Sequence, residues 1–204
     1  MPVAVGWKRY KTADVPASTF FTASGETRKV FAPDHPPAAK LEYAVYALEN
    51  GERLLIGPPR VIIRYKGAVP GWILLPHIFL MFAFMLFSSR IALSAFMNRA
   101  ILKHAVYLNF CFLLAGGFIL GPLTQHYAFG AYWTGIPFGH DLTDNKTLLP
   151  LCLWGASVVS ALRGGANLRK WVVAAFFATA AVYFIPHSVL GSELDYSKTD
   201  TISP

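Results

Sequence analysis

Apolar and polar residues are distributed unevenly along this chain, and the change falls near Pro70. Residues 71–190 consist of long uncharged runs joined by polar connections, whereas residues 1–70 are polar and rich in proline and glycine. Apolar runs of about 20 residues are long enough to cross the ~30 Å hydrocarbon core of a bilayer as helices. The pattern predicts an extramembrane domain over 1–70, a membrane domain over 71–190 and a polar tail over 191–204.

Four apolar runs are predicted to be transmembrane helices. The first, WILLPHIFLMFAFMLFSS, holds no charge before Arg90, and its proline lies in the first two turns, where a missing amide bond is tolerated best. The third run is short for a full crossing, unless it starts earlier or is tilted less than its neighbours. The predicted spans are about 71–93, 104–124, 146–162 and 171–189.

The first 70 residues show the alternation that is typical of strands. Alternate residues of 40–48 are apolar, Asn50-Gly51 follows directly, and residues 53–56 suit the returning strand. Asn-Gly favours a type I′ hairpin turn because both of its central residues need positive φ. Further strands are expected over 61–66 and around a turn at Ser24-Gly25. The predicted fold class is a membrane α-helical bundle of four transmembrane helices preceded by a small antiparallel β-sandwich-like domain.

Composition supports a membrane protein. The chain is 54% hydrophobic and only 14% charged, whereas soluble domains are about 25% charged. The net charge is +7, but the basic residues occur singly or in threes rather than as one stripe. The predicted partner is therefore the lipid bilayer and not a nucleic acid. The two cysteines, Cys111 and Cys152, form no CxxC pair, which excludes a zinc ribbon and covalent haem attachment.

Basic residues predict the orientation of the spans. The connections after the first and third spans hold three basic residues each, whereas the connection 121–150 holds only Lys146. The positive-inside rule places the first two in the cytoplasm, and the β-domain, 121–150 and the C-terminus outside. Three basic residues just before the first span favour the opposite orientation. Because an outside domain needs an export signal, we expect either a hydrophobic segment upstream of Met1 or an inverted topology.

The connection 121–150 is the candidate site, because it combines histidines, carboxylates and aromatic residues. Imidazoles at the outer ends of several spans could hold a transition metal or haem b, and a carboxylate could add an oxygen ligand or orient a histidine. The alternative is that these histidines only hydrogen bond to headgroups or loop carbonyls, since no two have ligand spacing on one helix. The candidate ligands are His77, His126, His140, His187 and Asp141.

Aromatic and small residues give two further hypotheses. The uncharged segment 129–138 suits an aromatic belt or a re-entrant segment, or alternatively the wall of a quinone or lipid pocket. Thr143 or Asp144 is expected to cap the third span. Small residues permit close packing of membrane helices, within the chain rather than between copies. The candidate pocket or interface residues are Tyr132, Trp133, Phe138 and Asp144, and the helix-packing residues are Gly117 and Gly121.

Three segments resemble stretches of one family of uncharacterised bacterial multi-spanning membrane proteins. They are 36–43 (PPAAKLEY), 64–70 (RYKGAVP) and 141–147 (DLTDNKT). The family has no assigned activity, so the resemblance transfers no functional residue. It implies a bacterial inner membrane and an extracytoplasmic β-domain ahead of the spans.

The sequence carries no catalytic signature. GxSxG, P-loop and GxGxxG motifs are absent, and the spans lack the buried charges of a transporter. The predicted function is an integral membrane protein that acts as a non-catalytic binding or accessory subunit, docking a protein partner through its β-domain and 121–150. One alternative is a haem- or metal-binding redox membrane protein that uses the outer-face histidines. A weaker alternative is a lipid- or quinone-binding protein.

Overall fold

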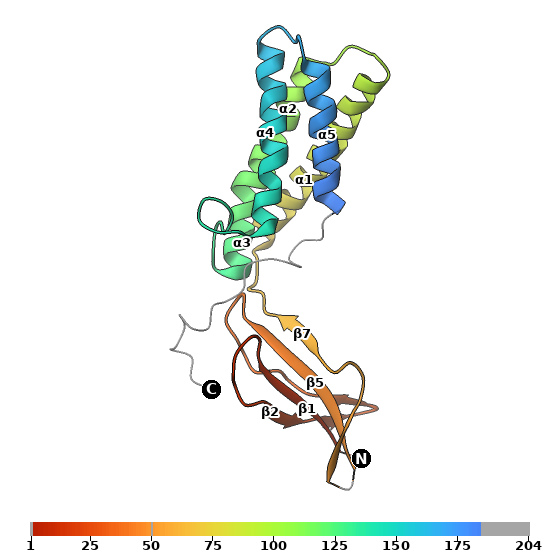
Figure 1. Ribbon diagram of the computed structural model, residues 1–204, viewed down its shortest axis with the longest axis vertical. Coiled ribbons are helices and arrows are strands. Elements are labelled where there is room, and N and C mark those ends of the chain that lie inside the picture. The colour runs from red at the N-terminus through yellow and green to blue at the C-terminus, as the bar shows by residue number, and fades with distance from the viewer. Residues whose placement is uncertain (1, 50, 185–204) are drawn as a thin grey trace. The chain divides into compact units, whose positions relative to one another are not determined.

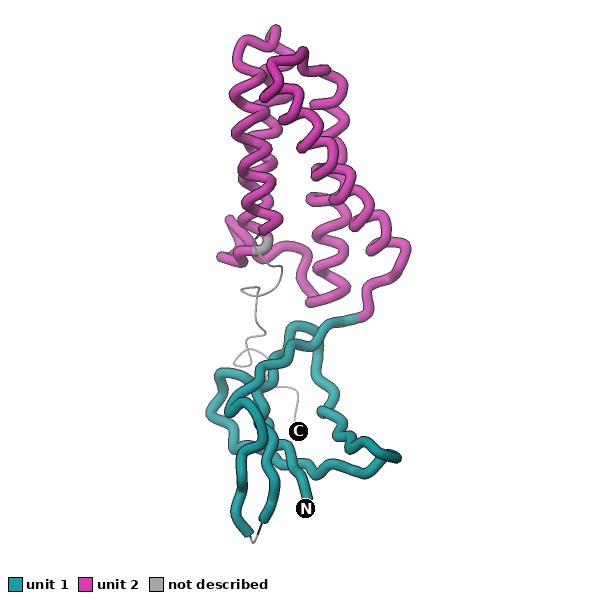
Figure 2. The backbone as a smooth tube through the Cα atoms, turned by 90° about the vertical axis from the view of Figure 1, so that its right-hand side faces the viewer, with its two compact units in different colours: residues 1–67, 193–204 teal, residues 68–192 magenta. Residues whose placement is uncertain are grey.

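The computed structural model describes residues 2–49 and 51–184, except for the side chain of Thr143. The described residues divide into two compact units, one ending at Gly67 and one beginning at Ala68 (Figure 2). The first unit is built from strands and the second from helices (Figure 1).

The described part of the first unit holds seven strands, five of which form one antiparallel sheet in the order β2-β1-β5-β6, with β7 also paired to β5 (Figure 1). β5 is the central strand, because β1 follows one of its edges and β6 and β7 share the other. The remaining strands form a separate two-stranded sheet. The strands are β1 (Val3–Arg9), β2 (Ala17–Phe20), β3 (Thr22–Ser24), β4 (Thr27–Lys29), β5 (Lys40–Glu49), β6 (Glu52–Leu55) and β7 (Val61–Arg64).

The strand pairing predicted on either side of both turns of this unit is confirmed. β5 pairs with β6 so that Glu49 lies opposite Glu52, and Gly51 has a φ of 86°. Asn50, the other half of the predicted Asn-Gly turn, lies outside the described residues. β3 and β4 pair around the second turn, with Ser24 opposite Thr27. The predicted sandwich-like arrangement is wrong, because the large sheet stands as a single layer beside one short hairpin.

The described part of the second unit holds five α-helices and one π-helical segment (Figure 1). α2, η1 and α3 follow one another without a break, so Lys103–Phe129 is one continuous helix of 27 residues. The elements are α1 (Gly71–Phe96), α2 (Lys103–Leu113), η1 (Leu114–Leu120), α3 (Gly121–Phe129), α4 (Leu142–Leu162) and α5 (Leu168–Phe184).

The predicted bundle of four transmembrane helices is also wrong. Within residues 2–49 and 51–184, only two helices are long and apolar enough to cross a membrane, Gly71–Phe96 and Lys103–Phe129. α4 begins at Leu142, so its first turns include the charged residues Asp144 and Lys146. The described α5 has 17 residues, and positions 185–189 of the fourth predicted span lie outside the described part. The fold is therefore a mixed one, a sheet unit and a helical unit.

The core of the helical unit is centred on Trp154 of α4. Its side chain is fully buried, meets the Phe84 ring edge to face at 6.2 Å, and donates from Nε1 to Thr179 Oγ1 at 3.1 Å. A second buried polar pair joins the α1 and α2 helices, where Asn109 Nδ2 donates to Ser88 Oγ at 3.1 Å. Pairing of buried polar groups removes most of the cost of burying them.

Small residues let α1 and η1 approach closely, but the closest approach is at Gly116. A Cβ there would lie 3.0 Å from Leu80 Cβ and 3.1 Å from Met81 Sδ, so the two helices leave no space for a side chain. At the predicted packing residues the nearest neighbours are more distant: Leu113 Cδ1 at 3.3 Å for Gly117, and Gly116 O at 3.5 Å for Gly121. These glycines therefore pack within the chain, mainly along the same helix.

Candidate functional site

The segment 130–141 is held against the start of α4 by a network of hydrogen bonds. Asp144 Oδ2 accepts from the Thr134 backbone N at 2.6 Å, from Thr134 Oγ1 at 3.1 Å and from Gln125 Nε2 at 3.1 Å. Thr134 Oγ1 is also 3.0 Å from Asp141 Oδ2. Asp141 and Asp144 are 8% and 5% exposed, so the hydrogen bonds of this network replace those that the carboxylates would make to water.

The position at which α4 begins explains why the segment 130–141 lies against the first turn of this helix. The helix begins at Leu142, earlier than predicted, and Asn145 N donates to Asp141 O at 3.0 Å. Asp144 therefore lies in the first turn, where a negative charge suits the helix dipole. Asn145 Oδ1 accepts from Ile136 N at 2.7 Å, and a Cβ on Gly135 would lie 2.6 Å from that oxygen. Only glycine fits at this approach.

The aromatic residues of the segment are either exposed or half-buried. The Tyr132 ring stacks on the His126 imidazole, with centroids 4.1 Å apart and planes within 1°. Trp133 lies 5.9 Å from Phe118 and donates from Nε1 to Ile136 O at 3.1 Å. Phe138 is 83% exposed and Tyr132 is 54% exposed. The segment thus presents apolar rings outward while its polar groups bond inward.

The predicted histidine ligands are placed separately. His77 donates from Nδ1 to Gly116 O at 2.9 Å, which commits that nitrogen to the packing of α1 on η1. His126 is stacked on Tyr132, and His140 is exposed. His187 lies outside the described residues. In the part of the chain that the structure describes, no three or more His, Cys, Asp or Glu side chains are grouped so that they could hold a metal ion.

A second polar site lies on one face of the five-stranded sheet. It is a cavity of about 230 Å³, which we call the sheet groove, and its floor is Gly6 of β1 and Ala44 of β5. Its charged lining residues come from four different segments, so the fold rather than local sequence assembles it. They are Lys8, Glu42, Arg53 and Arg60, and the apolar walls are Tyr46, Pro16 and Pro59.

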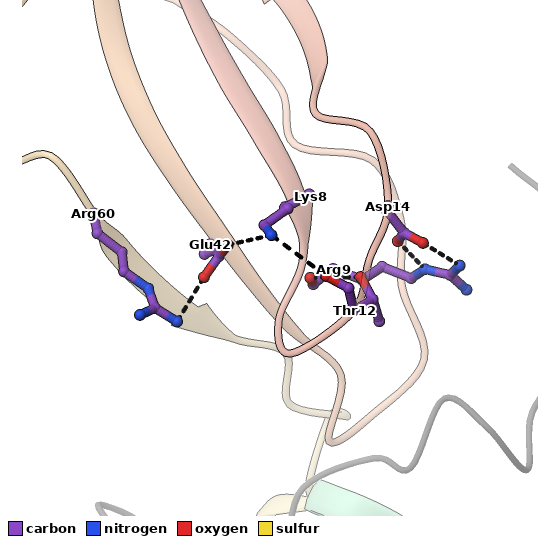
Figure 3. A network of polar contacts seen from close by, with 6 residues as sticks. All are labelled: Lys8, Arg9, Thr12, Asp14, Glu42 and Arg60. Carbon is purple, nitrogen blue, oxygen red and sulfur yellow. Dashed lines mark hydrogen bonds and ion pairs between the residues drawn. The ribbon is translucent and has the colours of Figure 1, made fainter.

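Glu42 organises the charges of the sheet groove. Lys8 lies opposite it on the neighbouring strand, with Nζ 3.1 Å from Oε1, and Arg60 Nη2 lies 2.7 Å from Oε2 (Figure 3). Burial raises the pKa of the Glu42 carboxyl, but the hydrogen bond from Lys8 and the charge of Arg60 outweigh burial and hold the pKa below its usual value. The carboxylate therefore stays ionised and holds two cations in place.

A separate ion pair fixes the turn after β1. Arg9 donates to Asp14 through Nε at 2.6 Å and through Nη2 at 2.9 Å, a two-pronged contact (Figure 3). The hydrogen bond from Arg9 lowers the pKa of Asp14 to about 2. Both side chains are about one-third exposed, so the pair orders the turn more than it stabilises the fold.

No protein family, no curated protein and no solved structure matches this chain. The function is therefore argued from the two polar sites and from the surface of the helices.

Sequence reasoning found the first site but missed the sheet groove. The signal that could have indicated it is an acid and a base that face each other on two strands, Glu42 in β5 and Lys8 in β1. β1 was not predicted as a strand, although Val3 and Val5 alternate with small residues. Arg60 was interpreted only as evidence of membrane orientation. Without β1 there was no second strand to bring Lys8 and Glu42 together.

The sheet unit is expected to lose stability in mild acid because of His35. Its ring lies 6.2 Å from Trp7 and 5.3 Å from Tyr65, and burial first, then the charge of Arg9, lowers its pKa against a weaker opposing effect of Asp34. A histidine whose pKa is lowered by folding binds its proton more readily in the unfolded chain. Stability is therefore complete above the unfolded pKa of 6.5 and falls as the pH drops from there through the folded pKa.

Hydrogen exchange of the full chain, corrected for its intrinsic pH dependence, measures this loss in β1 and β5. Protection should fall between about pH 7 and pH 5 in the natural chain and fall less in His35→Gln, which cannot take up the proton. An equal fall in both proteins would assign the effect to other groups.

Proposed function

We propose that this chain is a membrane-anchored, non-catalytic binding protein. In this proposal α1 and the continuous helix α2-η1-α3 cross the bilayer, and the sheet unit together with the segment 130–141 docks a protein partner. The observation that carries the proposal is the outward-facing apolar surface of the two long helices.

A core helix of a soluble protein is mostly buried, but these two helices are not. Only 17% of the most apolar window of α1 and 22% of that of Lys103–Phe129 is buried within the chain. The exposed apolar side chains of α1 recur at steps of three and four residues, with one step of seven across Ser89 and Arg90, so they form a stripe along one face. They are Trp72, Leu75, Phe79, Phe82, Leu86, Leu93 and Phe96, each more than half exposed. A stripe of this length suits lipid as its solvent.

The basic residues support an orientation for the helical unit. Arg169, at the start of α5, donates to Ala95 O at 2.9 Å, to Asn98 Oδ1 and to Arg99 O at 3.4 Å. The connections α1–α2 and α4–α5 therefore meet at one end of the unit (Figure 1). Under the positive-inside rule this basic end faces the cytoplasm. We propose a bacterial inner membrane, with the sheet unit and 130–141 on the outer side, since two crossings return the chain to the side where it started.

The docking role is proposed from the side chains that the two candidate sites expose to a partner. In 130–141 the exposed groups are apolar rings, including Tyr132 and Phe138, of the kind that anchor protein interfaces. In the sheet unit the exposed groups include Arg53 and Arg60 of the sheet groove. The absence of a catalytic motif in the sequence and the use of the buried carboxylates as internal hydrogen-bond acceptors favour binding over catalysis.

Charge placed on the α1 stripe tests the membrane proposal. The double variant Phe79→Lys/Phe82→Lys puts two ammonium groups on exposed positions of α1. Each lysine raises the free energy of membrane insertion by about 2.5–3.5 kcal/mol near the centre of a span. The full chain should be found in the membrane fraction and resist alkaline carbonate extraction, whereas the double variant should be largely lost from that fraction. The measurement is the share of tagged protein that sediments after carbonate treatment.

The matched control is Phe20→Lys/Phe31→Lys, the same chemical change at two exposed positions of the sheet unit, 58% and 84% exposed. Its membrane share should equal that of the natural chain. Extraction of the natural chain by carbonate, or equal losses in both double variants, would refute the proposed anchoring.

A further inference from the structure

We propose that the sheet groove binds a phosphomonoester whose phosphate is carried on a small apolar body. The inference deepens the binding role proposed above for the sheet unit and rests on it. It concerns the sheet groove alone, so it can fail while the membrane anchoring stands.

The charge of the sheet groove matches a dianion. Three cations, Lys8, Arg53 and Arg60, line it together with one carboxylate, Glu42, which leaves a surplus of two positive charges. A phosphomonoester carries about −1.5 to −2 at pH 7. A monoanion such as a carboxylate or a sulfate ester would leave part of this surplus uncompensated.

The cations are held ready for a ligand. Lys8 and Arg60 are fixed from opposite sides of Glu42, and the guanidinium of Arg60 also lies 5.2 Å from the centroid of the Tyr10 ring (Figure 3 shows the Glu42 contacts). Two ordered cations reduce the entropy lost when an anion binds. Arg53 is exposed and lines the same cavity. A guanidinium offers paired donors that match two phosphate oxygens.

The size and walls of the sheet groove require more than a phosphate. Its volume of about 230 Å³ exceeds what a phosphate group fills, and its other lining residues include Tyr46 and the rigid side chains of Pro16 and Pro59. The Tyr46 ring lies against Gly6, where a Cβ would be 3.2 Å from Tyr46 Cε2. An apolar or aromatic body beside the phosphate fits this wall.

The experiment compares phenyl phosphate with phenyl sulfate and with inorganic phosphate on the full chain in detergent, by isothermal titration calorimetry at low salt. Phenyl phosphate should bind with one site per chain and about tenfold more tightly than either of the other two. Phenyl sulfate has the same body with less charge, and inorganic phosphate has the charge without the body. Equal affinity for all three, or no binding of phenyl phosphate, would overturn the proposal.

Three variants place the binding at the sheet groove. Arg53→Gln should weaken phenyl phosphate binding about tenfold, and Arg53→Lys should restore part of it because the charge returns without the paired donors. Lys29→Gln, which removes one positive charge from β4 outside the lining residues, should bind like the natural chain. Equal weakening by Arg53→Gln and Lys29→Gln would show attraction to the whole basic unit and reject the site.

The last ligand of the experiment is a phosphotyrosyl peptide, since an aromatic phosphomonoester occurs both in small molecules and in modified proteins. Tighter binding of the peptide than of phenyl phosphate, lost in Arg53→Gln, would support a protein partner as the source. Tighter binding of phenyl phosphate would support a free small molecule. Membrane retention of Arg53→Gln, measured separately, shows whether the anchoring is intact.

Discussion

Trp154→Ala is expected to lower the free energy of unfolding of the helical unit by about 3–5 kcal/mol. The indole is fully buried, packs edge to face on Phe84, and donates to Thr179. Removing it leaves a cavity between α4 and its neighbours that the backbone cannot fill. The measurement is unfolding in mixed micelles with increasing denaturing detergent, followed by far-ultraviolet circular dichroism.

Two controls separate the parts of this effect. Trp154→Phe keeps an aromatic ring against Phe84 and should cost about 1 kcal/mol, since Thr179 loses a donor but still bonds to Ala175 O at 2.8 Å. Trp171→Ala makes the same change at a side chain that is 40% exposed and should cost much less. Similar losses for Trp154→Ala and Trp171→Ala would contradict a core centred on Trp154.

Asp144→Ala should release the segment 130–141 from α4. The carboxylate accepts three hydrogen bonds from Thr134 and Gln125. Alanine would leave the Thr134 backbone N–H without its acceptor, at roughly 1–3 kcal/mol, while Thr134 Oγ1 keeps Asp141 Oδ2 and Gln125 Nε2 keeps Thr134 Oγ1. The segment should then be cut rapidly by protease, and its amides should exchange faster, while α1 and α5 keep their protection. Hydrogen exchange followed by mass spectrometry on the full chain measures both.

Asp144→Asn is the matched control, because it keeps one acceptor oxygen in the same shape. It should retain most of the protection of 130–141, whereas the alanine variant loses it. If the alanine variant keeps full protection, the remaining bonds from Asn145 and Asp141 suffice to hold the segment, and Asp144 is not its main support.

Local patterns in the sequence predicted the hairpins and the long apolar helix at Gly71. Those elements depend on neighbouring residues: the Asn-Gly pair before β6 and an uncharged run in α1. The transmembrane count failed at α4, which begins at Leu142 rather than at 146, so that its first turns hold Asp144 and Lys146. Asp144 and Lys146 are 5% and 7% exposed there, and Asp144 bonds to Thr134 of the segment 130–141. That contact joins residues ten positions apart, so the periodicity of apolar residues along a helix does not predict it.

The candidate site was predicted only in part, for the same reason. The carboxylates Asp141 and Asp144 do come together, but around Thr134, which has no distinctive sequence signal. The histidines looked equivalent in sequence because each lay near a helix end. In the structure one packs against a backbone carbonyl and another against a tyrosine ring. The sheet groove depends on strand register, which fixes Lys8 opposite Glu42 and cannot be deduced from either strand alone.

The π-helical segment η1 has a consequence for how this chain can change in length. Gly121 N donates to Gly116 O, five residues back, and the same oxygen accepts from His77. A π-helical turn holds one residue more than an α-helical turn, so the helix before it and the helix after it keep their faces. Removal of one residue other than Gly116 from Leu114–Leu120 would therefore be taken up by a return to α-helical bonding, with α3 still facing Tyr132. The same removal within α1 would rotate everything after it by about 100°, so a change of one residue in length is tolerated better in η1 than in α1.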